Sequence, residues 1–236
     1  MAAELLRVEG LSKSFGPRAV LEGVSFAARE REVLGLIGPN GAGKTTLFEC
    51  VAGLMHADAG TVRYLGREVP APRRKGSLFY LPDGITPWPR QTLKWALGYF
   101  EKTYARGDVS AGELAEALKL GPLLGAHVGS LSKGERKRLL LALSLLTPHR
   151  LLLLDEPFDG LDLRQTRDVM RLLRAHAGRG RTLMLSIHQL TDAARVCDRL
   201  VLLSAGRVVG EGSLEELRES ARVEEGGLEE VFLALT

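Results

Sequence analysis

Short runs of apolar residues, bounded by turns that contain glycine, open the chain. They lie at residues 5–8, 24–27, 33–37 and 61–65, and their composition predicts β-strands. At residues 43–53, between the last two runs, apolar side chains recur at helical spacing. The opening third therefore predicts a set of strands and one helix, with a glycine-rich loop leading from a strand into that helix.

The pattern changes in the middle of the chain. Residues 86–148 are rich in helix formers and contain no convincing strand, which predicts a helical insertion. Strand character returns at residues 151–154 and 182–186, separated by a predicted helix at residues 164–175. A hairpin is predicted within residues 200–209, followed by short helices. Strands that alternate with helices predict a parallel sheet with right-handed crossovers.

Composition and charge narrow the class of protein. Hydrophobic residues make up 45% of the chain and charged residues 26%, which is typical of a globular protein with a buried core. The formal net charge is +3, with 32 Lys and Arg spread among 29 Asp and Glu. We therefore expect a solvated surface and no nucleic-acid partner. Cys50 and Cys197 lack the spacing of a disulfide framework or a zinc site.

No apolar run is long enough to predict a membrane span. The longest, at residues 139–146 and 151–154, fall short of the roughly 20 residues that a bilayer requires. Residues 1–8 lack the apolar stretch of a signal peptide. If a membrane is involved in function, we expect a different polypeptide to cross it.

A phosphate-binding loop is predicted between the strand at residues 33–37 and the following helix, because the segment fits the pattern G-x-x-x-x-G-K-[ST]. Its residues are Gly38, Pro39, Asn40, Gly41, Ala42, Gly43, Lys44, Thr45 and Thr46. Glycines let backbone N–H groups turn toward phosphate oxygens, and the helix N-terminus favours an anion. We expect Lys44 to reach the β- and γ-phosphates and the Thr45 hydroxyl to bind Mg²⁺. The alternative is a glycine-rich turn with a chance lysine.

Two carboxylates, Asp155 and Glu156, follow the apolar strand at residues 151–154. A parallel sheet places this strand end beside the phosphate loop. We expect Asp155 to hold Mg²⁺ through a water molecule and Glu156 to polarise the attacking water. The alternative is that two acids simply end a strand.

The segment Leu131-Ser132-Lys133-Gly134-Glu135 resembles the LSGGQ signature of ABC ATPases, and it precedes the acid pair as in that family. The resemblance covers essentially the full chain. It implies an α/β P-loop NTPase with a RecA-like, mainly parallel core sheet, an N-terminal antiparallel β subdomain and an inserted α-helical subdomain. We expect one domain over residues 1–236. The core and β subdomain would take residues 1–83 and 149–212, the helical subdomain 84–148, and C-terminal helices 213–236.

In the family, the signature binds the γ-phosphate of ATP held by the opposite subunit, which implicates Ser132, Gly134 and Glu135 in nucleotide binding. We expect Ser132 to be the N-cap of a helix at residues 133–146. Lys133 replaces a glycine of the family pattern and Glu135 a glutamine. Ser132 and Glu135 also form a capping box, which explains the acid without any contact to nucleotide.

Three further positions match family motifs. Residues 159–162 resemble the D-loop that crosses the dimer seam. His188, after the strand at residues 182–187, matches the switch histidine that contacts the γ-phosphate; an ordinary strand-end histidine is the alternative. Phe15 resembles the aromatic residue that stacks on adenine, with core packing as its alternative role. The resemblance thus implies that Glu156, His188 and Lys44 are catalytic.

Asp83 stands where the family usually has a glutamine that touches Mg²⁺ and reports to the transmembrane partner. A carboxylate could still bind Mg²⁺, together with Thr45 and Asp155, and we hypothesise a steeper dependence on Mg²⁺ concentration. An acid here resembles the ATPases of ABC-2-type exporters, as does the C-terminal segment at residues 228–236.

The resemblance implies ATP and Mg²⁺ as cofactors and two subunits, most simply a homodimer, that close on two ATP molecules. A separate integral membrane permease would hold the protein at the cytoplasmic face of the plasma membrane, with Trp88 and Trp95 as candidate contacts. Core packing is the alternative role for both tryptophans. An importer ATPase and a soluble or regulatory ABC ATPase remain alternatives for the whole protein.

Overall fold

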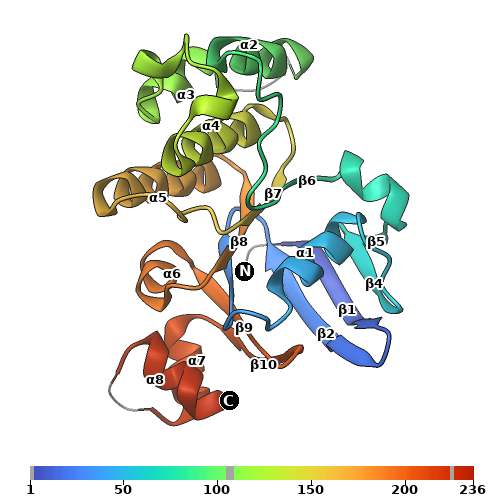
Figure 1. Ribbon diagram of the computed structural model, residues 1–236. Coiled ribbons are helices and arrows are strands. Elements are labelled where there is room, and N and C mark those ends of the chain that lie inside the picture. Colours follow the sequence, from blue (N-terminus) through green and yellow to red (C-terminus); the bar gives the residue numbers. More distant parts are fainter. Residues whose placement is uncertain (1–2, 105–108, 224–225) are drawn as a thin grey trace.

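The computed structural model describes residues 3–104, 109–223 and 226–236, which form two β-sheets flanked by helices (Figure 1). The smaller sheet is antiparallel, with strand order β2-β1-β4-β5. Its strands are β1 (Glu4–Phe15), β2 (Arg18–Arg29), β4 (Ala59–Tyr64) and β5 (Arg67–Glu68). The predicted N-terminal antiparallel β subdomain is confirmed.

The strands β1 and β2 are each 12 residues long and extend well beyond the predicted residues 5–8 and 24–27. Their outer halves carry polar and exposed residues, so the apolar pattern ends before the backbone pairing does. An antiparallel pair can continue in this way because one face of such a sheet tolerates water. Several register shifts interrupt the pairing of β1 with β2, which further obscures the alternation.

The larger sheet has strand order β10-β9-β3-β8-β7-β6. All neighbouring strands run parallel except the β9–β10 hairpin. The strands are β3 (Val33–Ile37), β6 (Leu78–Leu81), β7 (Leu151–Asp155), β8 (Thr182–Ile187), β9 (Arg199–Ser204) and β10 (Arg207–Gly212). The predicted parallel core sheet is confirmed. Within this sheet, sequence reasoning missed β6, whose four residues are too few to show a period.

The two faces of the larger sheet are covered differently. On one face, Leu36 of β3 and Leu153 of β7 pack with α1 (Lys44–Ala52) and with the inner face of the antiparallel sheet. On the other face, Ile37 and Leu154 join a second core that includes the helical insertion. Strands buried on both faces explain the continuous apolar run that the sequence shows before Asp155.

The remaining helices cover the second face or extend from it (Figure 1). They are α2 (Leu93–Thr103), α3 (Ala111–Ala117), α4 (Lys133–Leu146), α5 (Leu163–Gly178), α6 (Leu190–Val196), α7 (Leu214–Ala221) and α8 (Leu228–Leu235), with short 3-10 turns at Ala71–Gly76, Gly121–Leu123 and Val128–Ser130. The helices α2, α3 and α4 form the predicted insertion between β6 and β7. On α8, Leu228 and Val231 are buried, as the apolar spacing of the C-terminal segment predicts.

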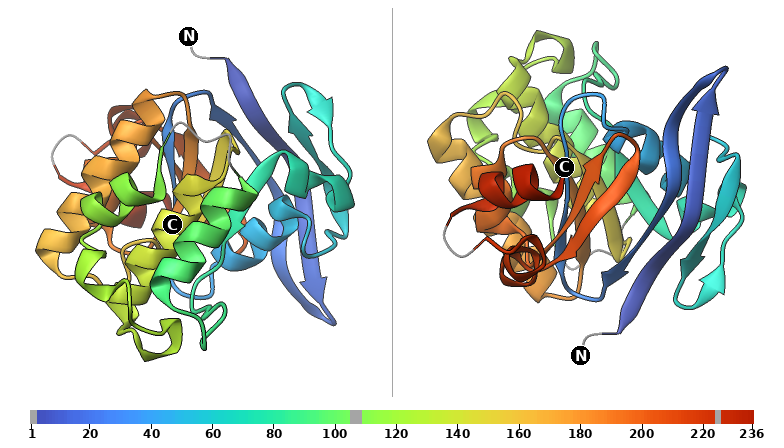
Figure 2. Two further views of the ribbon diagram at one scale, coloured as in Figure 1. Left: turned by 90° about the horizontal axis from the view of Figure 1, so that it is seen from above. Right: turned by 90° about the horizontal axis from the view of Figure 1, so that it is seen from below.

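The antiparallel sheet and α5 lie on opposite sides of the molecule (Figure 2). Among the described residues, no helix combines the length and the apolar character needed to cross a membrane. The division of the chain into subdomains by residue number remains a prediction.

Candidate functional site

The phosphate loop leads from β3 into α1, at the centre of the larger sheet. Gly43 caps α1 with φ 105°, a left-handed conformation that residues with a Cβ rarely adopt. Gly38 is needed for a different reason: a Cβ there would lie 2.3 Å from the carbonyl oxygen of Leu203. The first N–H groups of α1 have no partner within the helix, and this favours an anion at its N-terminus.

Lys44 lies within its own loop and is only 7% exposed. Its ammonium donates to the carbonyl oxygens of Gly38 at 2.7 Å and Pro39 at 3.3 Å, and lies 3.9 Å from Oε1 of Glu156. Burial lowers the pKa of Lys44 below its ordinary value, while the charges of Glu156 and Asp155 act in the opposite direction. A cation held at this position is available to phosphate oxygens bound by the same loop.

Asp155 is 1% exposed and accepts three hydrogen bonds. The Thr45 hydroxyl donates to Oδ2 at 2.9 Å, the Tyr80 hydroxyl donates to the same oxygen at 3.4 Å, and the Ser186 hydroxyl donates to Oδ1. Burial, and then the negative charge of Asp155, raise the pKa of Tyr80 far above its ordinary value, so Tyr80 remains a donor. These hydrogen bonds hold the carboxylate of Asp155 beside Thr45, the second residue of α1.

Glu156 adopts φ 48°, in the left-handed region that a non-glycine residue occupies at a cost of about 1–3 kcal/mol. Its N–H donates to the Ser186 hydroxyl at 2.9 Å, which holds this backbone turn against β8. Its Oε2 lies 2.6 Å from Nδ1 of His188, in hydrogen-bond contact. Asp155 and Glu156 are adjacent in the chain, yet the Asp155 side chain contacts Thr45 and the Glu156 side chain contacts His188.

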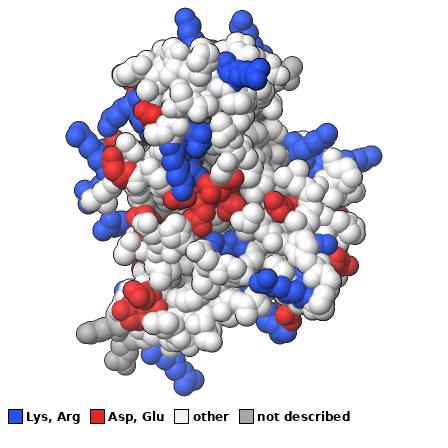
Figure 3. All heavy atoms as spheres, in the orientation of Figure 1, with Lys and Arg blue, Asp and Glu red and all other residues white. Residues whose placement is uncertain are grey.

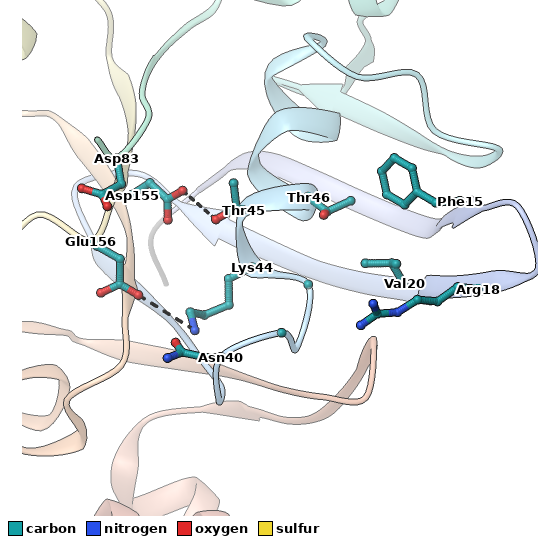
Figure 4. Close-up of a pocket in the computed structure, with 12 residues that line it drawn as sticks. Phe15, Arg18, Val20, Asn40, Lys44, Thr45, Thr46, Asp83, Asp155 and Glu156 are labelled. Atoms are coloured by element: carbon teal, nitrogen blue, oxygen red, sulfur yellow. Dashed lines mark hydrogen bonds and ion pairs between the residues drawn. The ribbon is translucent and has the colours of Figure 1, made fainter. Parts of the chain in front are cut away.

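A cavity of about 460 Å³ opens over the phosphate loop, within the usual size range of small-molecule sites. Figure 4 shows that the loop residues lie in the middle, with three carboxylates on one side and Phe15, Arg18 and Val20 on the other. The lining residues are Phe15, Arg18, Val20, Asn40, Gly41, Gly43, Lys44, Thr45, Thr46, Asp83, Asp155 and Glu156. Acidic side chains also gather in the middle of the face that Figure 3 presents.

Phe15 is 49% exposed, so its ring is not part of the core. The ammonium of Lys13 lies 5.5 Å from its ring centroid. Arg18 and Val20 come from β2 and were not among the residues singled out from the sequence, because no motif marks a strand that reaches the cavity only through the fold. Tyr80 and Ser186 were missed for the same reason, since each contacts Asp155 across neighbouring strands.

The donor set beside the loop suits Mg²⁺. The Thr45 hydroxyl and the Asp155 carboxylate are hard oxygen ligands that already contact each other. Across the described part of the chain, no group of three or more His, Cys, Asp or Glu side chains could hold a metal ion. Mg²⁺ usually keeps several waters and binds through one or two protein ligands plus substrate phosphates, so these residues fit a metal that arrives with a nucleotide.

Asp83 lies at the cavity but is already paired: Lys137 Nζ lies 2.6 Å from its Oδ1. Partial burial alone would raise the pKa of Asp83, but the hydrogen bond and charge of Lys137 outweigh it, so that the pKa lies below its ordinary value. The role of Asp83 as a metal ligand therefore stays a prediction, with one of its oxygens occupied by Lys137.

The signature segment does not line the cavity. Ser132 caps α4 in a complete capping box: its hydroxyl accepts from the N–H of Glu135 at 3.3 Å, and Glu135 Oε2 accepts from the N–H of Ser132 at 2.8 Å. Lys133 Nζ lies 2.6 Å from Oδ2 of Asp159, and a Cβ on Gly134 would lie 2.5 Å from the carbonyl oxygen of Gly160. The signature therefore packs on the D-loop of its own chain.

Four further residues of the predicted site do not line the cavity. Gly38, Pro39 and His188 line a neighbouring pocket of about 330 Å³, together with Phe232 of α8. Ala42 is buried within the loop. The structure thus brings the loop, the acid pair, Phe15 and Asp83 to one cavity, and leaves Ser132, Gly134 and Glu135 outside it.

A phosphate loop between a central parallel strand and its helix, with acids on the adjacent strand end, defines the nucleotide site of a P-loop NTPase. Known proteins agree. The family model described as ABC transporter matches residues 21–159. The chain therefore belongs to the ABC transporter family, as an ATP-binding subunit with the ATPase activity of that family.

Individual relatives support the assignment. The chain is 35% identical over 226 residues to Nod factor export ATP-binding protein I of Burkholderia orbicola (strain AU 1054), a match that covers 93% of this chain and 74% of that protein. The protein of the same name from Burkholderia lata is 36% identical over 216 residues, covering 89% and 71%. A solved structure of an ATP-binding subunit of an ABC transporter superposes with a TM-score of 0.88 at 28% identity, covering 98% and 99%.

Proposed function

We propose that this chain is the ATP-hydrolysing subunit of an ABC exporter, and that it binds MgATP in the cavity over the phosphate loop. The observation that carries the proposal is the arrangement in Figure 4, where Lys44 and Thr45 lie between three carboxylates and an exposed aromatic ring. The triphosphate lies on the loop. Its γ-phosphate points to Asp155 and Glu156, and the adenine lies against Phe15.

Hydrolysis depends on Glu156, which accepts a proton from the attacking water. His188 holds one oxygen of Glu156 and lines a pocket together with Gly38 and Pro39 of the phosphate loop. In our proposal, His188 contacts the γ-phosphate. Lys44 compensates the charge that develops on the transferred phosphoryl group. Thr45 and Asp155 would hold Mg²⁺, which supplies further charge neutralisation when bound.

One chain provides an incomplete site, and this supports a dimer. Ser132, Gly134 and Glu135 lie outside the cavity, although the N-terminus of α4 favours an anion. In our proposal, each signature meets the ATP bound by the other copy, so that nucleotide joins the two subunits. ATP carries about four negative charges, which helix N-termini and lysines from both copies would share. Closure and reopening of this dimer deliver the mechanical step.

The membrane partner would dock on an aromatic cluster in the helical insertion. Trp88, Trp95 and Tyr99 are all at least 38% exposed, and their rings lie 5.1–5.7 Å apart. Trp88 adopts φ 47°, an uncommon conformation for a bulky residue that is a typical feature of functional loops. In our proposal, a cytoplasmic segment of an integral permease docks on this surface, and the protein thereby lies peripherally at the cytoplasmic face of the membrane.

Export rather than import is supported by the relatives named for Nod factor export, and by the acid at position 83. The cargo would be selected by the permease. The alternatives are an importer ATPase and a soluble or regulatory cassette. The departures from the family pattern at Asp83, Lys133 and Glu135 suggest a regulatory cassette. Four intact residues argue against it: Lys44, Asp155, Glu156 and His188.

The decisive experiment compares the wild-type protein with Glu156→Gln. We expect wild type to hydrolyse ATP, and the variant, saturated with MgATP, to form a dimer by size exclusion with light scattering. A variant that stays monomeric at high concentration, alone and with its permease, contradicts the dimer. Equal background turnover by both proteins favours the regulatory cassette. The direction of transport is tested by nucleotide-dependent movement of cargo in vesicles that contain the co-purifying permease.

A further inference from the structure

An ion pair connects the nucleotide cavity to the helical insertion. Asp83 follows β6 and lines the cavity, while Lys137 belongs to α4, 54 residues later. Lys137 Nζ lies 2.6 Å from Asp83 Oδ1. The two ends of the pair differ in burial: the Lys137 side chain is 4% exposed and the Asp83 side chain is 38% exposed.

Because the Lys137 side chain is buried, its ammonium depends on this ion pair. A buried ammonium is costly unless it is paired, and removing one member of a buried pair leaves an uncompensated charge. The partner of the Lys137 ammonium is a carboxylate at the cavity edge. Two other ion pairs of the helical insertion, Lys119–Asp168 and Lys133–Asp159, have lysine side chains that are more than half exposed and lie outside the cavity, so water screens them.

The charge of the cavity makes the pair consequential for nucleotide. Asp83, Asp155 and Glu156 lie on the same side of the phosphate loop (Figure 4). A triphosphate adds about four negative charges beside them, and like charges in a partly buried site repel strongly. An unpaired Asp83 would therefore oppose binding of the anion, and Lys137 cancels that charge from outside the cavity lining.

We propose that Lys137 is a positioning residue that acts through Asp83: it neutralises this carboxylate and holds it at the cavity edge, so that the cavity accepts a nucleoside triphosphate. The inference rests on the proposed binding of ATP in this cavity. Lys137 follows Ser132 by little more than one helical turn. The ion pair therefore also connects the Asp83 edge of the cavity to the N-terminal end of α4, which carries the signature.

The test is a double-mutant cycle on ATP affinity, measured by isothermal titration calorimetry in EDTA so that neither Mg²⁺ nor turnover contributes. The proteins are wild type, Lys137→Met, Asp83→Asn and the double variant. We expect Lys137→Met to bind ATP about tenfold more weakly, and more so at low salt, because it leaves Asp83 unpaired. The double variant is expected to recover to within about twofold of wild type, because the repelling charge is also gone. Lys119→Met is the matched control. It breaks an exposed ion pair of the helical insertion and is expected to leave ATP affinity unchanged.

Two results overturn the inference. One is an ATP affinity of Lys137→Met equal to that of wild type. The other is a double variant that binds ATP as weakly as Lys137→Met, because the loss of affinity would then come from altered packing. If Lys137→Met does not fold, Asp83→Asn decides, since the inference requires affinity equal to wild type or higher and a threefold loss contradicts it. Failure of wild type itself to bind ATP overturns the proposed function, whereas tight binding by wild type with no effect of Lys137→Met overturns this inference alone.

Discussion

Nδ1 of His188 lies 2.6 Å from Oε2 of Glu156, although 32 residues separate them in the chain. The contact occupies one carboxylate oxygen, while the other lies 3.9 Å from the Lys44 ammonium. Glu156 is therefore held from two sides, and its backbone is held by Ser186. This geometry supports our proposal that Glu156 acts on the attacking water and that His188 orients that water.

Removing the Glu156 carboxylate should separate hydrolysis from binding. In Glu156→Gln we expect kcat to fall by about 100-fold or more, because an amide cannot accept the proton from water. Affinity for ATP should remain near that of wild type, since the phosphate loop is intact. Steady-state phosphate release and calorimetric titration measure the two quantities. His188→Ala should also lower kcat, and adding this change to Glu156→Gln should cost little more, because the two residues act as a unit. A fully additive loss would contradict that arrangement.

Thr45 provides a test of the proposed metal site. Thr45→Val removes the hydroxyl that contacts Asp155, and we expect the Mg²⁺ concentration for half-maximal activity to rise about tenfold. ATP affinity in EDTA should be unchanged, because a metal ligand does not contribute without metal. Thr45→Ser keeps the hydroxyl and serves as the control. An equal loss of affinity with and without Mg²⁺ would instead mean that Thr45 contacts phosphate directly.

Phe15 should contribute to affinity through stacking on the base. Stacking of a base on an aromatic ring is worth about 1–3 kcal/mol, so Phe15→Ala should weaken ATP binding by about fivefold to 150-fold. A ring stacks on any base, so GTP should lose a similar factor, and Phe15→Trp should retain affinity. Fluorescence titration with labelled nucleotides measures these values. Wild-type affinity in Phe15→Ala would place the adenine elsewhere, with Arg18 as the next residue to test.

Buried His176 should make stability sensitive to acid. Burial is the main cause that lowers the pKa of His176 from 6.5 to about 4, and the charges of Arg181 and Arg179 act in the same direction. The unfolded chain therefore takes up this proton first as the pH falls. His176 thus lowers the free energy of unfolding progressively between about pH 6.5 and pH 4, by at most about 3 kcal/mol.

His176→Gln should flatten this part of the pH profile of stability, as measured by urea unfolding at a series of pH values. His56 is exposed, and His56→Gln is the control that should keep the wild-type slope. A wild-type slope in His176→Gln as well would assign the acid sensitivity to other groups.

The aromatic cluster should matter for the partner and not for hydrolysis. Combining Trp88→Ala with Trp95→Ala should reduce co-purification with the permease at least about tenfold, because exposed aromatic residues often dominate interfaces. ATP turnover of the isolated subunit should stay within about twofold of wild type, since neither residue lines the cavity. Leu233→Ala removes another highly exposed apolar side chain, on α8, and is the matched control. Loss of ATPase activity in the double variant would indicate a structural role.

Much of the fold follows from local patterns. The helix predicted at residues 133–146 and the strand at residues 33–37 have the observed bounds, because a capping residue or a turn marks each end. The strand β6 was missed, and β1 was predicted too short, because one is too brief to show a period and the other continues on a face open to water. The existence of β6 and the length of β1 depend on hydrogen bonding between backbones, which the pattern of side chains does not encode.

The sequence by itself determined the phosphate loop, the acid pair that ends β7 and the family, because glycine, lysine and carboxylate spacing within a few residues dictates that local chemistry. The tertiary structure alone decided that Lys137 pairs with Asp83 and that Ser186 contacts both Asp155 and the Glu156 backbone. It also placed Arg18 at the cavity and the signature outside it. These are contacts between distant segments, and they exist because the two cores bring the ends of separate strands and helices together.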